Sequence, residues 1–162
     1  MSRENERDFG KKSLSIFVDG NTIVSALIFE GNESLLLKLG AIGACTLVTS
    51  RYVIDEVARV LEGREFRIRK DELPLMLQFV NRAVLVRENV GQHDLERCYA
   101  RLDDKKDAHV LAAFEKFKCD VLVTGDGELL KKVKGAKTTR QALGRILGAG
   151  EQPPQKKTET SK

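Results

Sequence analysis

The stretch VLVTGDGELL at residues 121–130 decides the fold that this sequence predicts. Its apolar, β-forming residues end at Thr124, and Asp126 then follows between two glycines. The stretch LSIFV at 14–18 has the same form and runs directly into Asp19. If two such strands lie parallel, both acids lie at the edge formed by the carboxyl ends of the strands, where open α/β sheets bind ligands. The two stretches therefore predict an acidic site at one edge of a parallel sheet.

Strand-like and helix-like runs alternate along the whole chain, which is typical of βαβ units. Short apolar runs predict strands at 14–18, 46–49, 84–86, 121–124 and 136–138. Helical periodicity predicts helices at 21–29, 33–40, 51–62, 71–83, 93–102, 107–117, 127–132 and 139–147. The predicted helix caps are Asn32, Ser50, Asp104 and either Thr138 or Thr139. The predicted fold is a three-layer α/β/α sandwich with a central parallel sheet of four to five strands.

A single domain is expected at residues 13–147, because no linker-like change of composition interrupts them. The chain has 162 residues, of which 41% are apolar and 32% charged, and this is enough to bury a core without disulfides. Residues 1–12 form a polar N-terminal extension. Residues 148–162 lack apolar periodicity and are expected to be disordered.

Composition and cysteine usage predict a cytoplasmic protein. The first twelve residues lack the apolar core of a secretory signal, and no segment approaches the length of a membrane span. Three cysteines, odd in number and far apart, predict small buried side chains in a reducing compartment rather than disulfides or a zinc ribbon. The formal net charge of +4 permits nucleic-acid binding without demonstrating it.

Four acids occupy the positions from which a parallel sheet presents ligands. Asp19 and Asp126 follow strands, whereas Glu56 and Asp107 lie in the first turns of helices. Helix N-termini packed on such a sheet lie at the same edge as the strand ends, so the four carboxylates are expected to converge. Clustered carboxylates repel one another unless a cation neutralises them, and oxygen ligands favour Mg²⁺ or Mn²⁺. The absence of a nearby set of His and Cys residues disfavours zinc.

Several of these residues also have purely structural interpretations. Asp107 with Asp104 makes a capping-type pair that suits the positive end of a helix dipole. His109 is expected to be a partly exposed helix residue that points away from Asp107, and His93 a helix-start residue. Asp55 is rotated by about 100° from its neighbour Glu56 on an ideal helix and is expected to face solvent.

Four segments resemble, in the correct order, the motifs of the PIN-domain ribonucleases, especially the small single-domain toxins of prokaryotic toxin/antitoxin pairs. FVDGNTIVSALIF at 17–29 resembles the first motif, and SRYVIDEVARVL at 50–61 resembles the second. DDKKDAHVLAA at 103–113 is similar to the third, and TGD at 124–126 is similar to the fourth. Each motif alone is common, whereas four in order are a specific signal spanning nearly the whole domain.

The resemblance implies an endoribonuclease that hydrolyses RNA phosphodiester bonds with a metal-activated water. The resemblance implies that Mg²⁺ or Mn²⁺ is held, directly or through water, by Asp19, Glu56 and Asp107. Asp126 would complete the acidic pocket. The residues that would support these acids are Asn21, Ser50 and Thr124. The basic residues nearest the motif acids, and so the candidates for touching RNA, are Arg51, Lys105 and Lys106.

The resemblance also implies protein partners, namely an antitoxin and a second copy of the chain in a homodimer. Apolar residues of the 71–83 helix, such as Leu75, Met76 and Phe79, are candidates for a dimer surface, although they suit the core equally well.

Three other functions compete with the toxin nuclease. An aspartyl-phosphate phosphatase would need a second Asp, as acid and base, two residues after the first. This chain has Asn21 at that position. A ribosomal-RNA processing nuclease would keep the same chemistry, although the lack of a zinc ribbon or second domain weighs against it. A non-catalytic PIN-like scaffold that binds RNA or protein would not need all four acids.

Overall fold

The fold is built on one sheet of five parallel strands in the order β3-β2-β1-β4-β5. The computed structural model describes residues 13–148. The strands are β1 (Ser15–Val18), β2 (Thr46–Ser50), β3 (Val84–Arg87), β4 (Val121–Val123) and β5 (Ala136–Lys137). In the register, Phe17 of β1 lies beside Val48 of β2 and Leu122 of β4. The predicted parallel sheet of a three-layer sandwich is confirmed, with five strands.

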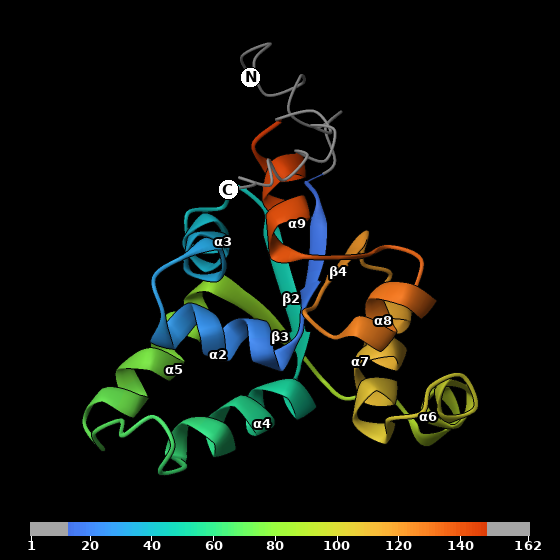
Figure 1. Cartoon of the computed structure of the whole chain (residues 1–162), viewed down its shortest axis with the longest axis horizontal. Coiled ribbons are helices and arrows are strands. Elements are labelled where there is room, and N and C mark those ends of the chain that lie inside the picture. The colour runs from blue at the N-terminus through green and yellow to red at the C-terminus, as the bar shows by residue number, and fades with distance from the viewer. Residues whose placement is uncertain (1–12, 149–162) are drawn as a thin grey trace, which may run out of the picture.

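Helices cover both faces of this sheet (Figure 1). Figure 1 shows α2, α3 and α5 on one side of the strands, and α6, α7 and α8 on the other. Neighbouring helices also pack on one another, α2 on α3 and α4, α3 on α9, and α6 on α7. The helices are α2 (Gly20–Ile28), α3 (Asn32–Ala41), α4 (Arg51–Glu62), α5 (Glu72–Ala83), α6 (Gln92–Tyr99), α7 (Lys105–Lys116), α8 (Gly127–Lys132) and α9 (Thr139–Ile146).

Side-chain caps fix where most of these helices begin. Ser50 accepts a hydrogen bond from the amide of Val53, and Asp104 accepts one from Lys106. Thr138, rather than Thr139, caps α9 and forms a capping box with Gln141. The prediction of Asn32 as a cap was wrong: α3 begins at Asn32 itself, and Gly31 takes the cap position with an extended backbone and no side chain to offer.

The core lies on both faces of the central strands. Ile16, Phe17 and Val18 of β1 are fully buried, as are all three residues of β4. Such continuous burial is expected for strands covered by helices on both faces. The ends of β1 and β4 are therefore held rigidly, and so are the acids that follow them.

Several sequence expectations concern residues at the margins of this fold. The predicted extension at 1–12 and all but the first residue of the predicted tail at 148–162 lie outside the described residues. Within residues 13–148, no helix is both long and apolar enough to cross a membrane. Cys45 and Cys98 are buried free thiols as expected, whereas Cys119 is only half-buried.

Candidate active site

Asp19 leaves β1 at the carboxyl edge of the sheet and caps α2. Its Oδ1 accepts a hydrogen bond from the amide of Gly20 at 2.6 Å. Its own amide donates to the carbonyl of Val123 at 3.1 Å, which ties it to the neighbouring strand β4. Burial raises the pKa of the Asp19 carboxyl, hydrogen bonds from Thr124 and Gly20 oppose that rise, and the charges of Asp126 and Glu56 add to it. The fold thus holds a half-buried carboxylate within reach of two other acids.

Thr124 joins the two acids that follow β1 and β4. Its Oγ1 donates to Asp19 Oδ2 at 2.8 Å and accepts a hydrogen bond from the amide of Asp126 at 3.1 Å. The Thr124 side chain is 1% exposed, so water does not compete for these bonds. Asp126 Oδ1 in turn accepts from the amide of Leu129 at 3.0 Å and caps α8. One buried hydroxyl therefore holds the carboxylate of Asp19 and the backbone of Asp126.

Asp107 enters the same site from the first turn of α7, because its cap Asp104 sets where that helix begins. Burial raises the pKa of Asp107 to about 6, and negative charges nearby contribute to the shift. Those charges belong, in decreasing order of effect, to Asp126, Asp104, Asp19 and Glu128. A carboxyl with such a high pKa carries negative charge that the protein itself does not compensate.

Glu56 lies at the periphery of this group, on α4. It is half-buried, and its Oε1 lies 3.6 Å from Arg59 Nη2 one turn further along the helix. The charge of Glu56 adds to the rise in the pKa of Asp19, so the two carboxylates interact electrostatically. Ser50 is buried and acts as the cap of α4, through which it sets the position of Glu56.

The donor chemistry of this site suits a hard divalent cation, although the protein alone does not form a closed cage. Within residues 13–148, no three His, Cys, Asp or Glu side chains lie close enough together to form a preassembled metal site. Mg²⁺ commonly takes one or two carboxylates and completes its shell with water and substrate oxygens. The uncompensated charge at Asp19 and Asp107 fits that mode of binding.

The other predicted site residues surround the acids without direct side-chain hydrogen bonds to them among the described residues. Asn21 is exposed on α2, two residues after Asp19. Arg51, Lys105 and Lys106 are exposed at the first residues of α4 and α7. These three cations therefore lie at the helix ends that face the carboxyl edge of the sheet.

A stacked aromatic pair beside Glu56 was not predicted from the sequence. The rings of Tyr52 and His109 lie 3.8 Å apart and are nearly parallel, at 4°. Burial lowers the pKa of His109, and the charge of Glu56 opposes that shift. The amide of Tyr52 also donates to Asn89 Oδ1 at 2.8 Å. His109 is half-buried as expected, and its stacking partner comes from a helix more than fifty residues earlier in the chain, which periodicity cannot reveal.

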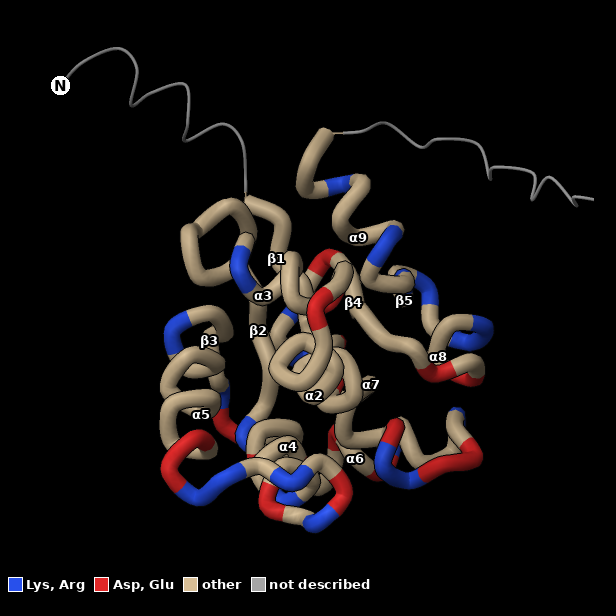
Figure 2. Tube along the Cα trace, turned by 60° about the vertical axis from the view of Figure 1, so that its left-hand side comes forward, with Lys and Arg blue, Asp and Glu red and all other residues tan. Residues whose placement is uncertain are grey.

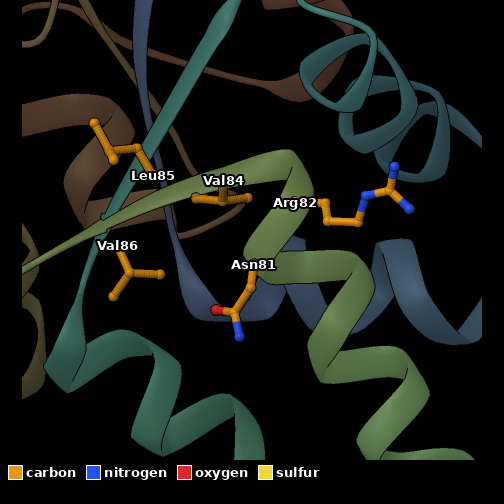
Figure 3. A pocket seen from close by; sticks show the side chains of 5 residues that line it. All are labelled: Asn81, Arg82, Val84, Leu85 and Val86. Atoms are coloured by element: carbon orange, nitrogen blue, oxygen red, sulfur yellow. The ribbon is translucent and has the colours of Figure 1, made fainter.

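A hollow of about 280 Å³ lies elsewhere, at the β3 edge of the sheet (Figure 3). Its lining residues are Asn81, Arg82, Val84, Leu85 and Val86. No carboxylate lines it, and β3 is separated from β1 by β2. The acidic site at the strand ends therefore lies outside this hollow.

Comparison with known proteins places this fold in a family. A family model described as "PIN domain" matches residues 15–128, which include all four acids. None of the curated proteins matches the chain significantly.

Solved structures with the same fold include PAE2754 from Pyrobaculum aerophilum, with 24% identity and a TM-score of 0.66 over 83% of this chain and 90% of that one. VapBC2 from Rickettsia felis, bound to a DNA fragment from its promoter, has 12% identity and a TM-score of 0.62 over 77% and 98%. VapC20 from Mycobacterium tuberculosis, a toxin that cleaves the sarcin-ricin loop, has 19% identity and a TM-score of 0.50 over 69% and 90%. At these identities the likeness shows the fold alone.

Proposed function

This chain belongs to the PIN domain family, and from that premise we propose that it is a metal-dependent endoribonuclease, the toxin of a toxin/antitoxin pair. The observation that carries the proposal is the group of acids at the carboxyl edge of the sheet. The Thr124 hydroxyl binds the carboxylate of Asp19 and the amide of Asp126. Burial raises the pKa of Asp19 and of Asp107, and the charge of Asp126 adds to both shifts. The proposed substrate class is in keeping with one solved structure of the same fold, VapC20, which is a toxin that cleaves the sarcin-ricin loop.

Asp19, Glu56, Asp107 and Asp126 are the residues that would hold Mg²⁺ or Mn²⁺, directly or through water. When bound, the cation lowers the pKa of a water molecule and offsets the charge that grows on the phosphate oxygens. Thr124 holds Asp19 and Asp126 in place, and Ser50 orients the helix that carries Glu56. None of these side chains need act as a nucleophile.

The backbone around Asp126 is open enough for a substrate to approach. A Cβ atom added at Gly125 or Gly127 would meet no atom within 4 Å, and neither residue has a positive φ. The fold itself therefore does not require glycine at either position. Because neither residue carries a side chain, a phosphate group has room to approach the main chain at this turn.

The decisive experiment is cleavage of a panel of single-stranded and structured RNAs by the purified protein, with and without Mn²⁺. We expect cleavage only with the cation, and a loss of at least a hundredfold in Glu56→Gln, because one ligand or orienting group of the cation is lost. Asp55→Asn serves as the matched control, since Asp55 is exposed on the same helix and this change also replaces a carboxylate by the amide of the same shape. Full activity in Glu56→Gln would remove Glu56 from the site, and binding without any cleavage would favour the non-catalytic scaffold.

The remaining partners stay predictions of the resemblance. These are an antitoxin protein and a homodimer in the cytoplasm. On α5, Leu75 is exposed and Met76 is half-buried, whereas Phe79 is half-buried and packs against the core. Of the three candidates for a dimer surface, Leu75 is therefore the one with a free side chain.

A further inference from the structure

The last twenty described residues have a charge opposite to that of the rest of the fold. Residues 129–148 contain six Lys and Arg residues and no Asp or Glu, whereas residues 13–128 contain 15 Lys and Arg against 19 Asp and Glu. The family match ends at residue 128, so this basic segment lies beyond the part of the chain that the family model describes. The positive charge is therefore a property of this chain and not of the matched motifs.

The basic residues of this segment extend over one side of the molecule. Lys131 and Lys132 are the last two residues of α8, Lys137 is the last residue of β5, and Arg140 is the second residue of α9. Figure 2 shows Lys and Arg residues in blue along α8, β5 and α9. Among the described residues, only Lys132 of the six makes an ion pair, with Glu128 and Asp103. We call the five others the basic strip: Lys131, Lys134, Lys137, Arg140 and Arg145. Four of its members are exposed, and Lys137 is half-buried.

The strip begins directly beside the acids. Lys137 pairs with Val123 in the sheet, and its carbonyl accepts a hydrogen bond from the amide of Thr124 at 3.1 Å. Thr124 is the residue whose hydroxyl binds Asp19. The helix that carries Lys131 is capped by Asp126, and the cap of α9 follows Lys137 immediately. A nucleic-acid backbone that extends from the acidic site along β5 would therefore lie directly beside the cations of the basic strip.

The chemistry of the strip fits a nucleic-acid backbone better than a protein or a lipid surface. Only one large apolar side chain of residues 129–148 is exposed, Leu147 at 61%. Protein interfaces are depleted in Lys and rely on buried apolar anchors, and membrane-surface helices need an apolar face. Unpaired, exposed cations without such anchors suit the regularly spaced charges of phosphates.

We propose that the basic strip binds the phosphates of single-stranded RNA on one side of the bond that the acids cut. This inference rests on the proposed nuclease function and adds the path by which the substrate lies on the protein. The inference assigns RNA binding to cations that the sequence analysis did not name. The cations named there, Arg51, Lys105 and Lys106, lie at the N-terminal ends of α4 and α7.

The test compares two triple variants with the same change of charge. Lys131→Ser, Lys134→Ser and Arg140→Ser remove three exposed members of the strip. Arg64→Ser, Arg67→Ser and Lys70→Ser remove three exposed cations from the loop between α4 and α5. The binding of a labelled 12-nucleotide single-stranded RNA is measured by fluorescence anisotropy in EDTA, which prevents cleavage, over a range of salt concentrations.

We expect the strip variant to bind at least tenfold more weakly at about 0.1 M salt. Its slope of log Kd against log salt should fall by about 2, since each phosphate contact on a single strand contributes about 0.7. The loop variant should keep the wild-type slope. Arg140→Ser alone should lower the slope by about 0.7, which keeps the test decisive if the triple variant folds poorly.

Equal slopes in the two triple variants, or no binding of RNA by the wild type, would overturn the inference. Tighter binding of duplex DNA than of RNA of the same length would overturn the assignment to RNA. The cleavage assay with Mn²⁺ is independent of this measurement. Strip-dependent binding without cleavage would refute the nuclease proposal and leave the inference standing, whereas cleavage with unchanged salt slopes would do the reverse.

Discussion

The raised pKa of Asp107 shows how the edge of this sheet affects a carboxylate. The folded protein holds its pKa at about 6, against 3.8 for an unperturbed Asp, so the folded state binds a proton more tightly than the unfolded chain does. This contribution to stability is fully present below about pH 4 and is lost as the pH rises through 6. At neutral pH the uncompensated charge therefore opposes folding, and a cation at the site would remove that cost.

The first prediction concerns Asp107→Asn, which removes this charge without changing the shape of the side chain. We expect the metal-free variant to be more stable than the wild type at pH 7.5 by about 1 kcal/mol, or a Tm higher by roughly 2–4 °C. At pH 4.5 most of the difference should disappear, because the wild-type carboxyl is then protonated. Thermal unfolding at both pH values measures it.

Asp55→Asn is the control for this prediction, because Asp55 is exposed on α4 and should give no shift at either pH. A gain at pH 4.5 as large as that at pH 7.5 would contradict the electrostatic explanation.

The sequence predicts that Asp19 and Asp126 follow buried strands, but it does not predict the contacts that hold them. An acid after a buried strand can be recognised from its apolar neighbours, which is how Asp19 and Asp126 were identified. The double role of the Thr124 hydroxyl depends on the register of β1 and β4, and the stacking of Tyr52 on His109 depends on how α4 meets α7. The influence of Glu128 on Asp107 is likewise set by packing.

At the scale of single elements, alternating patterns predicted every strand and helix to within a few residues. Capping residues made this possible, because a helix begins directly after its N-cap. The N-caps of α4, α7 and α9 are Ser50, Asp104 and Thr138. Two of the differences have clear local causes. Gly31 rather than Asn32 precedes α3, and α6 ends at Tyr99 instead of 102, because Ala100 already closes its last turn.

Gly40 illustrates a packing requirement that no local pattern contains. It lies in α3, where an added Cβ would come within 2.5 Å of Leu47 Cδ1 and 2.7 Å of the carbonyl oxygen of Ala83. We expect Gly40→Ala to destabilise the protein by about 1–3 kcal/mol, because backbone and core would have to move apart. This would exceed the gain in helix propensity, and denaturant unfolding measures the sum.

Gly125→Ala is the matched comparison for Gly40→Ala, because nothing lies within 4 Å of its added Cβ. Its stability should stay within about 0.5 kcal/mol of the wild type. A Gly40→Ala variant as stable as Gly125→Ala would show that α3 can shift on the sheet.

At the scale of the whole molecule, the acidic site exists only when the sheet is complete, since Asp19 and Asp126 belong to strands that pair across more than a hundred residues. Any cation that binds there should therefore stabilise the folded state as a whole. Mn²⁺ at ten times its dissociation constant should add about 1.4 kcal/mol to the free energy of unfolding. The double variant Asp19→Asn/Asp107→Asn should gain much less.

Thermal unfolding with and without Mn²⁺ or Mg²⁺ tests this prediction. Ca²⁺-free buffer with EDTA provides the metal-free baseline for both proteins. Equal cation-induced shifts in the wild type and in the double variant would mean that the ion binds somewhere other than these acids.

The opposite charges of residues 13–128 and 129–148 give the protein a permanent electric dipole along a direction fixed by the fold. An approaching polyanion exerts a torque on such a molecule and turns its basic side forward before the two touch. Encounters then begin with the strand ends already facing the polyanion, so a larger fraction of collisions leads to binding. Dissolved ions weaken this alignment beyond roughly 10 Å, which makes capture, more than the later bond-breaking step, sensitive to ionic conditions.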